Sequence, residues 1–350
     1  MAAAAVLFAA AILLSVRKKT GGEWLSREDT SALRGVMAVF ILFVHLPDVC
    51  SFLNENYAAT FEPFIFQGHL AVGLFFALSG YGLALSAEKG FSGFFRRRFF
   101  EVLLPYFLCN LVFLFAIRAG GQEVGMLDML GSWFTGDPLV TYSWYVVTQL
   151  IFYVFFYIAF RCFNGRAMKI AALYIFVSVY MRWAPRFGWP LVTTRGCFCF
   201  VLGASVGALK REIDMILARR KTGLLLAVSG VLFLISHVLY FAVPLIKETP
   251  LFDGSSVFFV VFIFLLNRVF VLAPPFFHVL GKCSLEIYLY QNLAFILMRR
   301  VFVMLGSDNV FAYACASIAF AAAGAAAVHF AYGTVKGLLV KFPVFQDKSA

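Results

Sequence analysis

The sequence has little charge and no polar stretch long enough to form a soluble domain. Only 13% of its 350 residues are Asp, Glu, Lys or Arg, whereas 62% are hydrophobic, well above the roughly 45–50% of a typical soluble domain. Runs of about 20 apolar residues, enough to cross ~30 Å of hydrocarbon, recur along the chain with short breaks. The composition therefore excludes a soluble enzyme and predicts an all-α, polytopic transmembrane helical bundle.

The sequence also lacks the cysteine spacing of a zinc site and a polar domain with a basic face. Its seven cysteines are scattered, mostly in apolar runs, so we expect buried thiols and no metal site. Cys197 and Cys199 are the pair that could be proposed as ligands. The net charge is +11, and the basic residues lie between apolar runs. Nucleic acid is therefore not an expected partner, because binding it needs a basic face on a polar domain. The expected surroundings are the lipid bilayer.

The N-terminal apolar run, residues 2–16, would span only ~22 Å as a helix. The basic triplet at 17–19 follows this run, the reverse of the order in a cleaved signal peptide. We therefore expect a short anchor and linker over 1–33, a membrane domain over 34–335 and a cytoplasmic tail over 336–350. The expected core spans lie near residues 34–53, 68–87, 99–118, 143–160, 170–183, 195–209, 223–246, 254–273, 284–304 and 310–335, which makes ten spans, or eleven with the anchor.

Loop charge predicts the orientation of these spans, because cytoplasmic loops of membrane proteins are enriched in Lys and Arg. Alternate breaks hold nearly all the basic residues, whereas the break at 54–67 has none and the one at 119–142 has only acidic charges. This pattern predicts a multi-pass protein of the cell membrane with a cytoplasmic C-terminus. Five arginines depart from the pattern and are read either as interfacial anchors or as ligand contacts: Arg182, Arg186, Arg195, Arg299 and Arg300.

The first core span carries an Arg at its start and a His eleven residues later, in the stretch RGVMAVFILFVH from Arg34 to His45. The polar residues at 26–29 precede it and are suited to cap a helix. On a helix, eleven residues correspond to ~16 Å and bring both side chains back to nearly the same face. The loop charges place Arg34 at the cytoplasmic edge and His45 about halfway across. This separation suits an acyl-coenzyme A, whose phosphates and thioester lie at opposite ends of its pantetheine arm.

Four stretches of this chain resemble motifs of the acyltransferase-3 family, whose members are polytopic membrane enzymes that O-acylate carbohydrates of the bacterial envelope. Arg34-Gly35 with His45 resembles the family's Arg, ten residues, His motif. The other three are the run GLFFALSGYG from Gly73, the basic triplet Arg96–Arg98 ahead of LPY, and GKCSLEIYL from Gly281, with a weaker match at Ser143-Trp144-Tyr145.

The resemblance implies an O-acyltransferase of the bacterial inner membrane that uses acyl-coenzyme A, with acetyl-coenzyme A the expected donor and no permanently bound cofactor. The acceptor would be a hydroxyl of an envelope glycan or a lipid-linked sugar. His45 would be the general base, because an imidazole with a pKa near 6.5 accepts a hydroxyl proton. Arg34, Arg96, Arg97 and Arg98 would bind the donor phosphates. Ordinary cytoplasmic loop charge is the alternative for the triplet and for Arg34. For His45 the alternative is a neutral histidine bonded to a neighbouring helix.

The chain departs from the family pattern at two positions. The family usually has a His where this chain has Gln291, and Gln forms hydrogen bonds but carries no proton. His45 would then act alone or with Glu286, whose alternative role is pairing with Lys282. Many members also have Arg-x-x-Arg in the basic loop, whereas Arg98 is followed three residues on by Glu101, so one phosphate contact is expected to be missing.

The remaining candidates have a structural alternative each. Asp48 would either orient the imidazole of His45 or be an ordinary carboxylate at the end of the helix. Ser79 and Tyr81 would line the substrate pocket or only pack. Trp144 and Tyr145 would stack on a sugar or belong to an interfacial aromatic belt. The last two substrate-binding candidates, Tyr288 and Gln291, lie in or just after the stretch that begins at Gly281.

Two other functions fit the sequence. A transporter of a sugar or an acyl carrier would use Arg34, His45 and Glu286 as a proton-coupled path, and an internal inverted repeat would favour it. An inactive relative with a scaffold role would explain Gln291 in place of His. The acceptor, the acyl chain length and the choice between direct transfer and an acyl-enzyme stay open.

Overall fold

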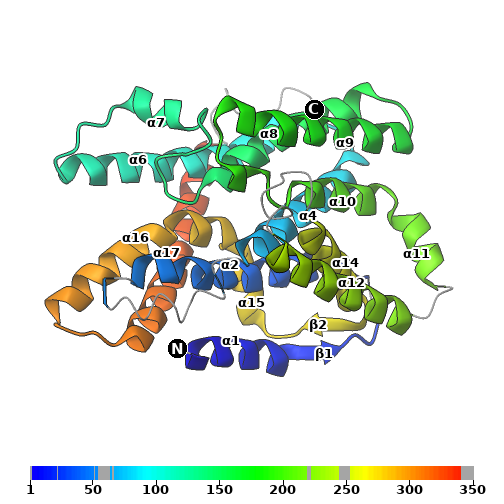
Figure 1. Ribbon diagram of the computed structural model, residues 1–350. Helices are drawn as coiled ribbons and strands as arrows, with labels where there is room; N and C mark the ends of the chain where they lie inside the picture. Colours follow the sequence, from blue (N-terminus) through cyan, green and yellow to red (C-terminus); the bar gives the residue numbers. More distant parts are fainter. Residues whose placement is uncertain are drawn as a thin grey trace. The chain divides into compact units, whose positions relative to one another are not determined.

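The computed structural model describes residues 2–21, 23–50, 52–53, 64, 67–218, 222–243 and 253–339 and is almost entirely helical (Figure 1). Most of the expected external loop at 54–67, the basic residues Arg219–Lys221 and the tail from 340 onward lie outside the described residues. The chain forms two compact units. Unit 1 comprises Met1–Ala71, Phe95–Cys109 and Phe270–Ala350, and unit 2 comprises Val72–Phe94 and Asn110–Val269.

The elements follow one another in the order of the predicted spans, with short helices between them. In chain order they are α1 (Ala2–Ser15), β1 (Val16–Lys18), α2 (Arg27–Cys50), α4 (Gly68–Ala87), α5 (Phe94–Arg98), a π-helix (Phe99–Leu103), α6 (Leu104–Ala119), α7 (Met126–Ser132), α8 (Trp144–Cys162), α9 (Arg166–Trp183), two 3₁₀ turns (Ala184–Phe187 and Leu191–Thr194), α10 (Cys197–Ala208), α11 (Lys210–Ala218), α12 (Thr222–Ala242), α14 (Gly254–Val269), β2 (Phe270–Leu272), α15 (Pro275–Lys282), α16 (Ser284–Met304) and α17 (Val310–Leu339).

Among the described residues, eight helices are long and apolar enough to cross a membrane. This confirms the all-α membrane architecture, with fewer qualifying helices than the ten or eleven spans expected. α14 has only 16 residues and α1 only 14, and α16 is long enough but carries Glu286, Arg299 and Arg300. The expected span at 254–273 ends at Val269, because the chain then becomes a strand.

In unit 1, α2 and α15 pack closely against each other, and two glycines lie at their contact. A Cβ atom at Gly35 would collide with the backbone carbonyl of Phe277, and one at Gly281 would collide with the carbonyl of Ser31. Two stretches that carry the family resemblance, at Gly35 and at Gly281, therefore meet in the fold. Glycine is needed at both positions because the two backbones leave no room for a side chain.

Unit 1 also contains the two short strands. Val16, Arg17 and Lys18 of β1 pair antiparallel with Leu272, Val271 and Phe270 of β2. This pairing joins the segment after α1 to the segment before α15 (Figure 1). Two residues of the basic triplet that follows the anchor, Arg17 and Lys18, therefore belong to strand β1.

Unit 2 has a second glycine crossing, between α4 and α10. A Cβ at Gly80 would collide with the carbonyl of Phe200, and one at Gly203 with the carbonyl of Ala77. Beside this crossing, the buried ring of Phe152 on α8 lies 5.2 Å from the ring of Phe200. Gly80 therefore allows the backbones of α4 and α10 to approach closely.

The cysteines follow the expectation in part. All seven are free. The two exposed thiols, Cys162 and Cys315, lie at the end of α8 and on α17, where apolar helix surface is not covered by other helices. The five buried ones are Cys50, Cys109, Cys197, Cys199 and Cys283.

Candidate active site

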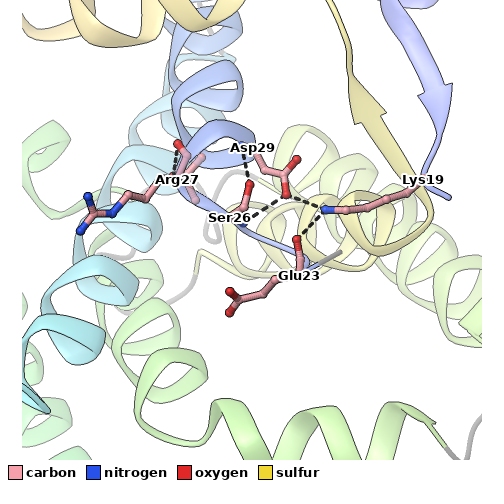
Figure 2. A network of polar contacts seen from close by, with 6 residues as sticks. Lys19, Glu23, Ser26, Arg27 and Asp29 are labelled. Atoms are coloured by element: carbon pink, nitrogen blue, oxygen red, sulfur yellow. Dashed lines mark hydrogen bonds and ion pairs between the residues drawn. The ribbon is translucent and has the colours of Figure 1, made fainter. Parts of the chain in front are cut away.

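The helix that carries Arg34 and His45 begins at a reciprocal side-chain cap. The backbone N–H of Asp29 donates to Ser26 Oγ, and the backbone N–H of Ser26 donates to Asp29 Oδ2, each at 3.1 Å. Lys19 Nζ donates to the same carboxylate oxygen at 2.6 Å and to the carbonyl oxygen of Glu23 at 2.8 Å (Figure 2). Asp29 is buried. The predicted cap is therefore formed, and an ion pair ties it to the segment after β1.

α2 then runs without a break from Arg27 to Cys50 and continues through Pro47. Arg34 lies on its exposed side, where Nε donates to the carbonyl of Thr30 at 3.3 Å. The side chain of His45 is only 15% exposed. Because the helix is continuous between them, the eleven-residue spacing of the two side chains corresponds to the expected ~16 Å along its axis.

Asp48 follows His45 by three residues on the same helix. Its Oδ2 lies 4.0 Å from His45 Nδ1, and its side chain is 41% exposed. This distance exceeds that of a hydrogen bond. The geometry gives Asp48 an electrostatic influence on His45 and no direct hold on the orientation of the imidazole.

Glu286 is bonded to a histidine from the last helix. Glu286 Oε1 lies 2.7 Å from His329 Nδ1, and Glu286 is 5% exposed whereas the His329 side chain is 37% exposed. The considered partner Lys282 is exposed. Glu286 Oε2 is buried and has no hydrogen-bond partner among the described residues. His329 is a functional candidate that the sequence reasoning missed; the signal was an acidic residue in an apolar span, which requires a partner.

Cys283 precedes Glu286 in the same late segment. Burial is the main cause that raises the pKa of its thiol, the Glu286 carboxylate raises it further, and Lys282 opposes the shift. The thiol is therefore protonated at neutral pH, which makes Cys283 a poor nucleophile.

Gln291, where the family resemblance leads us to expect a histidine, is fully buried on α16. Its Nε2 donates to the backbone carbonyl of Tyr288 at 2.9 Å. Its Oε1 is buried without a hydrogen-bond partner among the described residues. Tyr288 is buried as well. Both candidates thus face the interior of unit 1.

The basic triplet forms the short helix α5, which leads directly into the π-helix. Arg98 Nη1 lies 3.3 Å from Glu101 Oε2, so the acidic residue expected to weaken the phosphate site does engage one arginine. Arg97 is exposed and Arg96 half-buried. The hydroxyl of Tyr332, one turn after His329 on α17, donates to the Phe100 carbonyl. This bond ties the π-helix to α17.

Unit 2 holds the other substrate-binding candidates. Tyr81 is 2% exposed, with its ring 6.3 Å from that of Phe264, and Ser79 is half-buried. Tyr145 is half-buried and packs against Phe76, with ring centroids 4.7 Å apart. Trp144 is half-buried.

The candidates are therefore divided between the two units. Unit 1 contains the residues proposed as acid–base and donor-binding groups: Arg34, His45, Asp48, Arg96, Arg97, Arg98, Glu286, Tyr288 and Gln291. Unit 2 holds those proposed to contact the acceptor: Ser79, Tyr81, Trp144 and Tyr145.

Comparison with known proteins identifies the family of this chain. The model of the acyltransferase domain of the acyltransferase-3 family matches residues 29–329. The matched region begins at the capping residue Asp29 and ends at His329. No curated protein and no solved structure matches the chain. With most of its length matched and with its apolar helices, the chain belongs to the acyltransferase-3 family of membrane acyltransferases.

Proposed function

We propose that this protein transfers an acyl group, with acetyl the favoured one, from cytoplasmic acyl-coenzyme A to a hydroxyl of an envelope glycan or lipid-linked sugar. His45 is the general base of this reaction. The observation that carries the proposal is the continuity of α2 from Arg34 to His45, in a chain that belongs to an acyltransferase family.

The donor site follows from the charges of unit 1. Arg34 presents an exposed guanidinium about 16 Å along the helix from His45, and Arg96–Arg98 supply further cationic groups in the same unit. Guanidinium groups bind phosphate oxygens through paired N–H donors. An acyl-coenzyme A held by its phosphates at Arg34 would extend its thioester toward His45.

The reaction requires one proton to move. The acceptor hydroxyl oxygen forms a bond to the thioester carbonyl carbon while His45 takes the hydroxyl proton, and the carbon–sulfur bond breaks. The coenzyme A thiolate leaves and receives the proton from the imidazolium, which regenerates the base. Direct transfer needs no acyl-enzyme intermediate.

Glu286 is the second ionisable group of the proposed site, and its bond to His329 supports an acid–base role over a structural ion pair with Lys282. Asp48 contributes negative charge near His45, which favours the imidazolium that forms during transfer. Tyr288 and Gln291 are proposed to bind substrate from unit 1.

The acceptor contacts are proposed for unit 2. Trp144 is half-buried and its ring is suited to stack on a sugar, whereas the packing of Tyr145 on Phe76 supports a structural role for that ring. Ser79 and Tyr81 complete the proposed acceptor side. We place the protein in a bacterial inner membrane, with Arg34 and the C-terminus on the cytoplasmic side.

The test uses membranes that contain the full chain, supplied with radiolabelled acetyl-coenzyme A and endogenous glycan acceptors. We expect His45→Ala to lower label transfer by about 10²–10⁴-fold, the usual contribution of a general base. His278→Ala removes an imidazole outside the proposed site and is expected to keep full activity. Both variants must be present in the membrane at equal amounts.

An unchanged transfer rate in His45→Ala would refute the assigned base. A wild-type chain that binds acetyl-coenzyme A without producing ester, and gains activity in Gln291→His, would be an inactive relative. Uptake of a sugar by proteoliposomes without any ester formation would instead indicate a transporter.

A further inference from the structure

Arg195 lies in unit 2, between the 3₁₀ turn Leu191–Thr194 and α10, and is deeply buried. It is 8% exposed, which excludes the interfacial anchor considered from the sequence. Its Nη1 atom is buried and has no hydrogen-bond partner among the described residues. An arginine side chain has five N–H donors and cannot lose its charge at neutral pH. A buried donor of this kind requires an acceptor that the described side chains do not provide.

The neighbour on one side is an aromatic ring. The guanidinium carbon of Arg195 lies 5.7 Å from the ring centroid of Tyr240, in the last turn of α12. A ring of this kind attracts a desolvated cation. The attraction acts across the ring face, so it does not supply an oxygen acceptor for Nη1.

The preceding turn of α12 contributes a hydrogen-bonded pair of polar side chains. His237, three residues before Tyr240, has Nδ1 2.8 Å from the hydroxyl oxygen of Ser255. Ser255 is 1% exposed and lies in the first turn of α14. The pair places a hydroxyl and an imidazole beside the start of a helix.

Asp253 connects the starts of two helices through backbone hydrogen bonds. Its Oδ1 accepts from the backbone N–H of Ser256 at 3.1 Å, and its Oδ2 accepts from the backbone N–H of Gly196 at 2.6 Å. Gly196 follows Arg195 directly and has a φ of +70°, which favours glycine. One buried carboxylate therefore ties the start of α10 to the start of α14. It is engaged by these backbone donors and leaves Nη1 of Arg195 unmatched.

Three contacts and the chain connections between neighbouring residues link a group that we call the Arg195 cluster: Arg195, Gly196, His237, Tyr240, Asp253 and Ser255. We propose that the Arg195 cluster binds a phosphate group, with Arg195 Nη1 as its principal donor. Phosphate oxygens suit the planar arrangement of guanidinium donors.

The cluster also adjoins the helix of the SGY motif. A Cβ at Gly73 of α4 would lie 3.1 Å from Ser256 Cβ and 3.1 Å from Cys199 Sγ. Ser79 and Tyr81 follow Gly73 on the same helix. A phosphate in the cluster would thus be held in unit 2, the unit of the proposed acceptor contacts, although the inference does not depend on acyl transfer.

The experiment compares two arginines with the same type of ring contact. Arg186 is exposed and lies 5.3 Å from the ring of Trp183, so Arg186→Gln is the matched control for Arg195→Gln. The full chain, purified in a maltoside detergent without phosphate, is titrated with inorganic phosphate against chloride at equal ionic strength. Binding is measured by calorimetry and by the thermal unfolding midpoint. In a second arm, phosphatidic acid in mixed micelles replaces inorganic phosphate.

We expect saturable binding of phosphate or of phosphatidic acid by the wild type and by Arg186→Gln, with affinity at least tenfold lower in Arg195→Gln. Binding in the second arm alone would identify the source as a lipid headgroup, whereas binding in both would identify a site for free phosphate groups. If Arg195→Gln does not fold, Arg195→Lys and Ser255→Ala are used, each expected to weaken binding. Equal affinities in all variants, or no saturable binding in either arm, would overturn the proposal.

Discussion

Glu286 Oε1 and His329 Nδ1 lie 2.7 Å apart, so a carboxylate near the start of α16 is held by an imidazole from α17. The pair is asymmetric: the carboxylate is buried and the imidazole is partly exposed. Since Nδ1 faces the carboxylate, Nε2 is the ring nitrogen left for other partners, as in catalytic carboxylate–histidine pairs. The bond also fixes the packing of α16 on α17, because a buried carboxylate without its partner is costly.

His329→Ala is expected to lower the free energy of unfolding by about 2 kcal/mol, within the range for a hydrogen bond to a charged group. His329→Gln should retain most of the stability, because its amide N–H₂ can donate to Glu286. Unfolding of the purified protein by heat in detergent gives the comparison, with His278→Ala as the control. Equal stability of His329→Ala and the wild type would show that the bond contributes nothing to the fold.

Much of the architecture follows from local signals in the sequence. The cap at Ser26 and Asp29 and the placement of Arg34 and His45 on one helix could be predicted, because helix starts and helical spacing depend on residues a few positions apart.

Contacts between distant segments could not be predicted. The pairing of Val16–Lys18 with Phe270–Leu272 joins two strands of three residues each, which are too short for a recognisable strand pattern. The prediction of a span to residue 273 was wrong for this reason. The role of His329 depends on a partner on another helix, 43 residues away in the sequence. The burial of Arg195 likewise depends on segments distant from it in the chain.

Two glycines on α4 provide a test of helix packing. Gly80→Ala places a methyl group against the Phe200 carbonyl, and we expect a loss of stability of about 1–3 kcal/mol, as for overpacked cores. Gly82→Ala is the control, because a Cβ there meets nothing within 4 Å. The thermal unfolding midpoints of the two variants give the comparison. Similar midpoints for both would contradict the close crossing of α4 and α10.

The capping residue Asp29 can be separated from its acidic neighbour. Asp29→Ala removes one backbone bond and the ion pair with Lys19, so we expect a destabilisation of about 1–2 kcal/mol, typical for a lost helix cap. Glu28→Ala removes an exposed charge from the same turn and should cost less than about 0.5 kcal/mol. If denaturant unfolding gives the same midpoint for both variants, the cap does not contribute to the stability of α2.

The roles proposed for Arg34 and His45 predict different kinetic effects. Arg34→Gln should raise KM for acetyl-coenzyme A by about 10- to 100-fold, because it removes charge-assisted phosphate contacts of about 1.5–3 kcal/mol, while kcat changes little. His45→Ala should lower kcat with a small effect on KM. Arg27→Gln is the control for Arg34, since Arg27 is an exposed arginine on the same helix. Steady-state rates of ester formation at varied acetyl-coenzyme A concentration separate the two effects. A fall in kcat without a change of KM in Arg34→Gln would place Arg34 at the reacting groups and remove it from the donor phosphates.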